Sequence, residues 1–102
     1  EIGNRNGEGN TLHLFGRIKK AQGNLESALI YFQKSLEIHK EIKSKIGYAN
    51  ALMYLAEIAA SLGDKKKALS QLEDALRLFQ EMGNSAAVAN ISSLLDKLNQ
   101  IP

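Results

Sequence analysis

The chain of 102 residues contains no cysteine, no tryptophan and only one proline. Without cysteine it can form no disulfide framework, no thiolate zinc site and no cysteine nucleophile, which excludes small disulfide-stabilised scaffolds and zinc fingers. The single proline is Pro102, so it cannot interrupt a helix that precedes it. The absence of cysteine fits a reducing compartment, and we expect a cytoplasmic location.

Net charge and long apolar runs are also scarce. The 13 lysines and arginines against 11 aspartates and glutamates leave a net charge of +2, which is too small and too dispersed for the basic face that nucleic-acid binding requires. No apolar run approaches the roughly 18 residues of a membrane span, and the first ten residues do not resemble a signal peptide. We therefore expect neither a nucleic-acid partner nor a membrane segment.

What the chain does contain is an internal repeat with a period of forty residues. A four-residue segment, Glu1-Ile2-Gly3-Asn4, recurs as Glu41-Ile42-Lys43-Ser44 and as Glu81-Met82-Gly83-Asn84. The same spacing of forty residues relates Asn10, Asn50 and Asn90. Self-similarity at such a period is typical of repeat architectures. It divides the single domain of residues 1–102 into a first repeat at 1–40, a second at 41–80 and a partial third at 81–102.

Each repeat has helical periodicity and its own turn signals. Apolar residues recur every three or four positions, and no stretch alternates like a strand. Gly23 and Gly63 can end one helix, while Asn24 and Asp64 can cap the next. We predict helices near 8–22, 25–43, 46–62, 65–82 and 85–99, with errors of about two to four residues. The predicted fold is therefore all-α, with two helical hairpins and one further helix.

The period alone is compatible with HEAT or armadillo repeats and with an elongated form of the tetratricopeptide unit, whose usual length is about 34 residues. Small residues at close helix crossings, alternating with bulky ones, favour the second. That alternation resembles the tetratricopeptide signature, with Leu12, Phe15, Gly16, Ala28, Phe32 and Ser35 in the first repeat and Leu52, Leu55, Ala56, Ala68, Leu72 and Ala75 in the second.

The longer unit resembles the subclass found in kinesin light chains and in scaffold proteins of the cell cortex. The resemblance implies a right-handed superhelix of helical hairpins, the tetratricopeptide solenoid, which binds proteins or peptides. The chain departs from the family pattern where an aromatic residue is usual, at Lys19 and Ala59, and where a proline is usual, at Lys40 and Gln80.

The two ends of the repeat array differ. Ser92 and Asp96 replace apolar or small residues of the earlier first helices, which predicts a polar-faced capping helix at 85–99. Glu1 and Ile2 match the tail of a second helix, so we expect the chain to be a fragment of a longer array. The first helix should then expose apolar surface, which predicts a homo-oligomer formed through that helix.

In the family that the chain resembles, the first helix of each hairpin lines a concave groove. The resemblance thus implies a peptide-binding groove made of Asn10, His13, Arg17, Lys20, Asn50, Met53, Glu57, Asn90, Ser93 and Lys97. An asparagine amide can both donate to and accept from a peptide backbone. The alternative is that the three asparagines are merely tolerated polar residues near helix starts. The basic residues outnumber Glu57 along this stripe, which weakly favours an acidic ligand.

No pattern in the sequence indicates a catalytic, phosphate-binding or metal site. His13 and His39 lie on different predicted helices without a paired nucleophile, and we expect both to be surface side chains. No glycine-rich phosphate loop or metal-ligand spacing is present. Tyr54 and Leu94 occupy places where a carboxylate clamp of the chaperone-binding kind needs polar residues. We expect an interaction module that is not an enzyme and binds no cofactor or metal. The alternatives are a self-assembling scaffold and the sensor part of a larger regulator.

Overall fold

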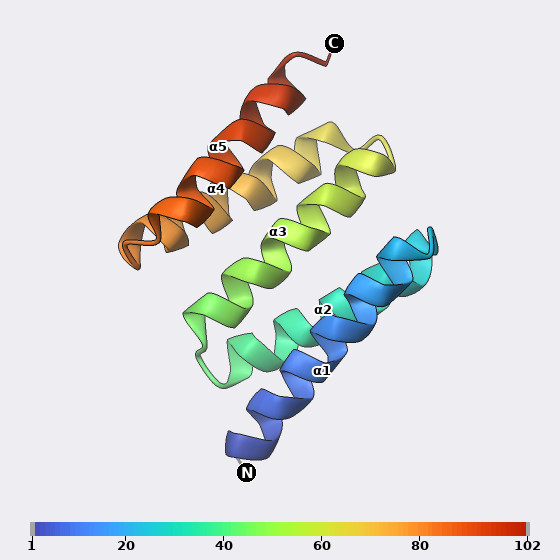
Figure 1. Ribbon diagram of the computed structural model, residues 1–102, viewed down its shortest axis with the longest axis vertical. Helices are drawn as coiled ribbons and strands as arrows, with labels where there is room; N and C mark the ends of the chain where they lie inside the picture. Colours follow the sequence, from blue (N-terminus) through green and yellow to red (C-terminus); the bar gives the residue numbers. More distant parts are fainter. Residues whose placement is uncertain (1, 102) are drawn as a thin grey trace. The chain divides into compact units, whose positions relative to one another are not determined.

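The computed structural model describes residues 2–101, with side chains from Asn4 to Ile101. Within this part the chain forms five helices and no strand (Figure 1): α1 (Ile2–Ala21), α2 (Leu25–Glu41), α3 (Lys45–Ser61), α4 (Lys65–Glu81) and α5 (Ser85–Asn99). The predicted all-α fold of helical hairpins is confirmed, and α2 to α5 begin and end within two residues of their predicted bounds. None of the helices formed by residues 2–101 combines the length and apolar character that crossing a bilayer demands.

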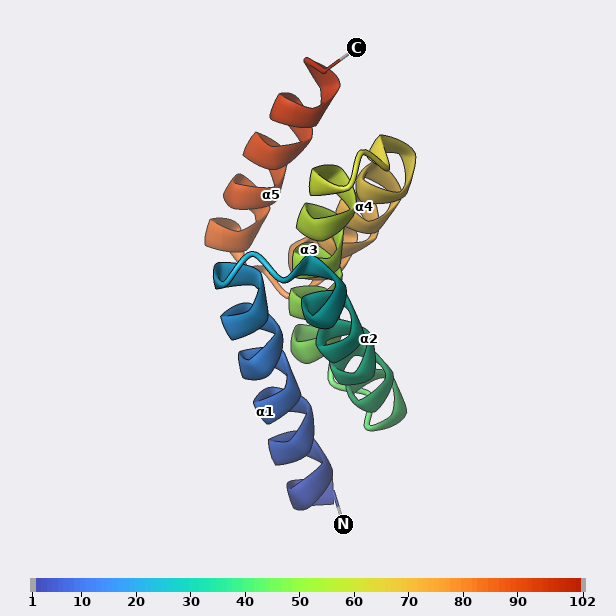
Figure 2. The same cartoon turned by 90° about the vertical axis from the view of Figure 1, so that its right-hand side faces the viewer.

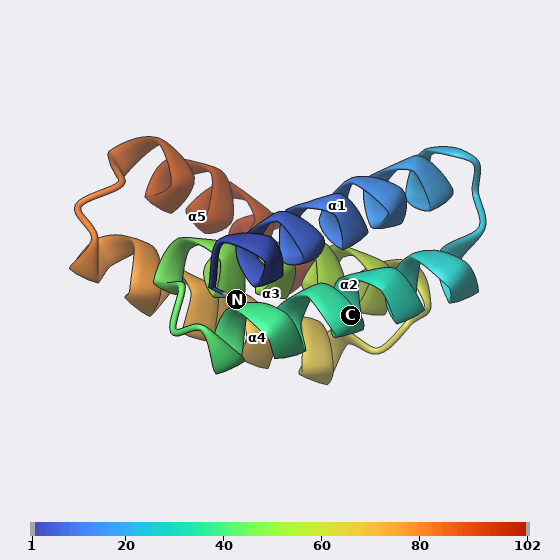
Figure 3. The same cartoon turned by 90° about the horizontal axis from the view of Figure 1, so that it is seen from below.

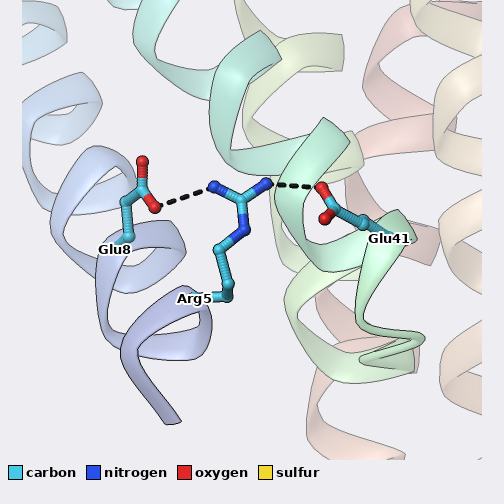
Figure 4. Close-up of polar contacts among 3 residues, drawn as sticks. All are labelled: Arg5, Glu8 and Glu41. Atoms are coloured by element: carbon cyan, nitrogen blue, oxygen red, sulfur yellow. Dashed lines mark hydrogen bonds and ion pairs between the residues drawn. The ribbon is translucent and has the colours of Figure 1, made fainter. Parts of the chain in front are cut away.

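The start of α1 was predicted wrongly. Gly3 and Asn4 are helical, although the corresponding residues of the later repeats, 43–44 and 83–84, lie in turns between helices. In those later turns the amide of the fourth residue donates to a carbonyl five positions earlier. Arg5 instead joins the first turns of α1 to the end of α2, because its guanidinium pairs with Glu8 at 2.8 Å and also with Glu41 (Figure 4).

The four turns between helices share one hydrogen-bonded geometry. Gly23, Gly63 and Gly83 have positive φ, and Lys43 takes the same conformation with φ of 59°. The next residue then caps the following helix: the side chains of Asn24, Asp64, Asn84 and Ser44 accept a hydrogen bond from the amide three positions on, at 3.1–3.3 Å. The predicted glycine and cap residues are confirmed.

The chain forms two compact units, Glu1–Ala51 and Leu52–Pro102, whose boundary falls inside the continuous helix α3. In the first unit α1 and α2 run antiparallel, side by side along their length (Figures 2 and 3). The first turns of α3 belong to this unit as well. In the second unit α4 and α5 pack together.

The core of the first unit depends on the small residues predicted at helix crossings. A Cβ atom added to Gly16 would lie 2.9 Å from the buried ring of Phe32, so only glycine permits this approach. The Ser35 hydroxyl donates a hydrogen bond of 2.9 Å to the Gly9 carbonyl. Ala28, also small, is fully buried. The second unit has a core of the same kind, formed by Leu55, Ile58, Ala68, Leu72, Ala75, Phe79 and Ile91.

Candidate functional site

The predicted polar stripe is present on α1. Asn10, His13, Arg17 and Lys20 follow one another at intervals of three or four residues, which places them on one face of the helix. Asn10 and Arg17 are exposed, whereas His13 and Lys20 are partly buried. This face thus offers an amide, an imidazole and two cations to a ligand.

The imidazole of His13 is held by the core beneath it. Its ring packs edge-to-face on Phe32, with the ring centroids 5.2 Å apart and the planes at 68°. Burial lowers the pKa of His13 below its ordinary value of 6.5, and the nearby positive charge of Arg17 lowers it further. His13 is therefore neutral at pH 7, and the positive charge of the stripe comes from Arg17 and Lys20.

The remaining predicted site residues lie on α3 and α5, and none of them is buried. Asn50 is partly exposed in the first unit, as are Met53 and Glu57 in the second. Asn90, Ser93 and Lys97 are exposed on α5. The side chains are thus accessible within each unit. The ladder that would join the three asparagines remains a prediction.

The prediction for His39 was wrong, because this residue is in the core and not on the surface. Only 2% of it is exposed, and its ring lies between Gly9 of α1 and Gly47 of α3. One signal in the sequence could have revealed this: forty residues later the same position is Phe79, which is buried. A second is that Gly9 and Gly47 stand where the next repeat has Ala49 and Ala87.

A second accessible feature of α1 is apolar. Leu14, Phe15 and Ile18 are about half exposed, and Phe15 contacts the ring of Tyr31 with centroids 5.6 Å apart. In α3, by contrast, the residues at the positions of Phe15 and Ile18 are Leu55 and Ile58, exposed by 1% and 0%. This exposed surface agrees with the prediction for the first helix. We call Leu14, Phe15 and Ile18 the apolar patch.

The described residues carry no constellation that suggests chemistry. Between Asn4 and Ile101 no group of three histidine or acidic side chains is placed to hold a metal ion. The accessible features are the polar side chains of α1, α3 and α5 and the apolar patch. Such surfaces are suited to binding another molecule.

Comparison with known proteins agrees with this geometry. Residues 3–81 match the tetratricopeptide repeat family, a range that runs from the start of α1 to the end of α4. No curated protein matches the chain. The match covers most of the sequence and includes both helical hairpins. The chain belongs to the tetratricopeptide repeat family.

Proposed function

We propose that the protein is an interaction module that binds an extended peptide, or an extended segment of a partner protein, through the polar side chains predicted for the groove on α1, α3 and α5. Tetratricopeptide repeats generally mediate protein–protein interactions and are not catalytic, and helical repeat arrays present extended binding surfaces. The observation that carries the proposal is the recurrence of Asn10, Asn50 and Asn90 in one register, none of them buried.

Hydrogen bonds from three asparagines do not suffice for this function. Each adds about 0.5–1.5 kcal/mol net, whereas micromolar binding requires about 8 kcal/mol. Side-chain contacts must supply the rest. Met53 offers a flexible apolar wall, and Arg17 and Lys20 attract carboxylates. The ligand that fits best is an extended, slightly acidic peptide.

Removing the central amide and the arginine tests this surface. We expect Asn50→Ala to weaken the binding of an acidic peptide, selected on the wild-type chain from a display library, by about two- to tenfold. Arg17→Ala should act in the same direction and make binding less sensitive to salt. Fluorescence anisotropy at two ionic strengths measures both effects.

Arg77→Ala is the matched control, because Arg77 is an exposed arginine on α4, outside the stripes. All three variants should unfold within about 0.5 kcal/mol of the wild type, as is usual for surface substitutions. The proposal fails if Arg17→Ala and Asn50→Ala bind the peptide as tightly as Arg77→Ala does.

The apolar patch favours a second candidate function, which is self-assembly. Three half-exposed apolar side chains on one helix form a surface whose burial is energetically favourable. A second copy of the chain carries the same surface, so two copies can bury it against each other. In this proposal the protein is a homo-oligomerising scaffold, formed through α1 or by exchange of a hairpin.

Sedimentation velocity at tens of micromolar tests self-assembly. We expect the wild type to contain dimers and Ile18→Lys to be monomeric. Ile30→Lys is the control, because Ile30 is an equally exposed isoleucine on α2, outside the patch. A monomeric wild type, or equal dissociation by both substitutions, would contradict this role.

We also propose that the repeats belong to the long-unit subclass of the family, that α5 caps the array and that the protein is cytoplasmic. A role as the sensor part of a larger regulator is a further alternative.

A further inference from the structure

His39 of α2 is enclosed by two neighbouring helices of the first unit. A Cβ atom at Gly9 of α1 would lie 2.9 Å from its Nε2, and a Cβ atom at Gly47 of α3 would lie 2.2 Å from its Nδ1. The ring therefore fits only because both neighbours lack a side chain. It is 2% exposed, so water cannot solvate it without movement of α1 or α3.

The hydrogen bonding of the ring suits only its neutral form. Nδ1 is buried and has no hydrogen-bond partner. In a neutral imidazole Nδ1 can be the nitrogen without a proton, whereas the protonated ring carries an N–H at both nitrogens. Protonation would then create an unsatisfied buried donor and an unpaired buried charge, both of which are costly.

We propose that His39 is an acid-sensitive latch of the first unit: in its neutral form it holds α1, α2 and the first turns of α3 together, and its protonation releases them. The second unit has Phe79 at the same repeat position, which is buried and cannot titrate. The latch is therefore specific to the first unit. It does not depend on whether the chain binds a peptide or a second copy of itself.

The titratable groups around His39 leave its neutral form favoured. On α1, His13 is itself held neutral, and Glu8 is paired with Arg5. On α2, the neighbouring Lys40 is exposed. At the α2–α3 turn and the start of α3 the groups are Glu41, Lys43 and Lys45, which are exposed, and Tyr48, which is partly buried. Glu41 is paired with Arg5.

The direction of the pH dependence follows from burial. Burial lowers the pKa of His39 below 6.5 in the folded chain, while the unfolded chain keeps a value of about 6.5. Between these two values the unfolded state binds more protons. Stability is therefore complete above about pH 6.5 and decreases as the pH falls through this window.

Amide hydrogen exchange of the full chain at pH 7.5 and pH 5.0, corrected for intrinsic rates, tests the latch. We expect amides of α1 and α2 to lose protection several-fold at the lower pH, with a smaller loss in α4 and α5. His39→Gln has no group that titrates here and should remove most of this difference. His13→Gln is the matched control: it removes the other histidine whose pKa is lowered in the folded chain and should retain most of the difference, because His39 is intact.

An equal loss of protection in His39→Gln and the wild type would overturn the proposal, as would unchanged protection of the wild type. If His39→Gln does not fold, ring proton shifts of the wild type decide the question by NMR. Titration of His39 below pH 6.5, together with loss of α1 and α2 signals, supports the latch. Titration at or above 6.5 in an intact fold excludes it.

Discussion

Replacing Phe32 with alanine is expected to lower the free energy of unfolding by about 3–5 kcal/mol, the usual cost of removing a buried phenylalanine. Its side chain is fully buried, closely approached by the backbone of Gly16 and in contact with the ring of His13. The surrounding structure relaxes only partly into such a cavity, so the lost packing is not fully recovered. Total stability is about 5–15 kcal/mol for proteins of this kind, so the loss is a large fraction of it.

Urea denaturation followed by circular dichroism measures this loss. Phe15→Ala is the control, since Phe15 is 47% exposed, and it should cost about 1 kcal/mol. Phe79→Ala removes a buried ring from the second unit and should cost about as much as Phe32→Ala. Equal losses for Phe32→Ala and Phe15→Ala would show that the first unit is not packed as described.

Replacing Gly47 with alanine is expected to destabilise the protein by about 2 kcal/mol, even though alanine is the better helix former. The new Cβ would lie 2.2–2.5 Å from three atoms of the His39 ring. The ring is buried and is blocked on its other side by Gly9, so it cannot turn away. The melting temperature should fall by about 10 °C.

Gly7→Ala provides a control in the same protein. Gly7 also lies within a helix, but a Cβ atom there meets nothing within 4 Å. That substitution should stabilise the chain by about 0.5–1 kcal/mol. In a double-mutant cycle, Gly47→Ala should couple to His39→Ala, because the shorter side chain removes the clash. Thermal unfolding of the four chains measures this, and a stabilising Gly47→Ala would contradict the enclosed position of His39.

The helices and turns were largely determined by neighbours in the sequence. Apolar periodicity predicted α2 to α5, and each helix after the first begins at a cap whose side chain bonds the amide three positions on. Such interactions span one turn, so the sequence displays them directly. The same logic failed at Gly3-Asn4, which are helical although the corresponding residues form a turn later in the chain.

The sequence also identified accessible polar residues on the first helices, because helical spacing and polarity are visible in it. The tertiary structure decided the state of the two histidines. His39 is buried by Gly9 and Gly47, which belong to other helices, and the pKa of His13 is lowered by its place against the core. Burial depends on residues brought together by packing, whereas helix formation depends mainly on residues within one turn.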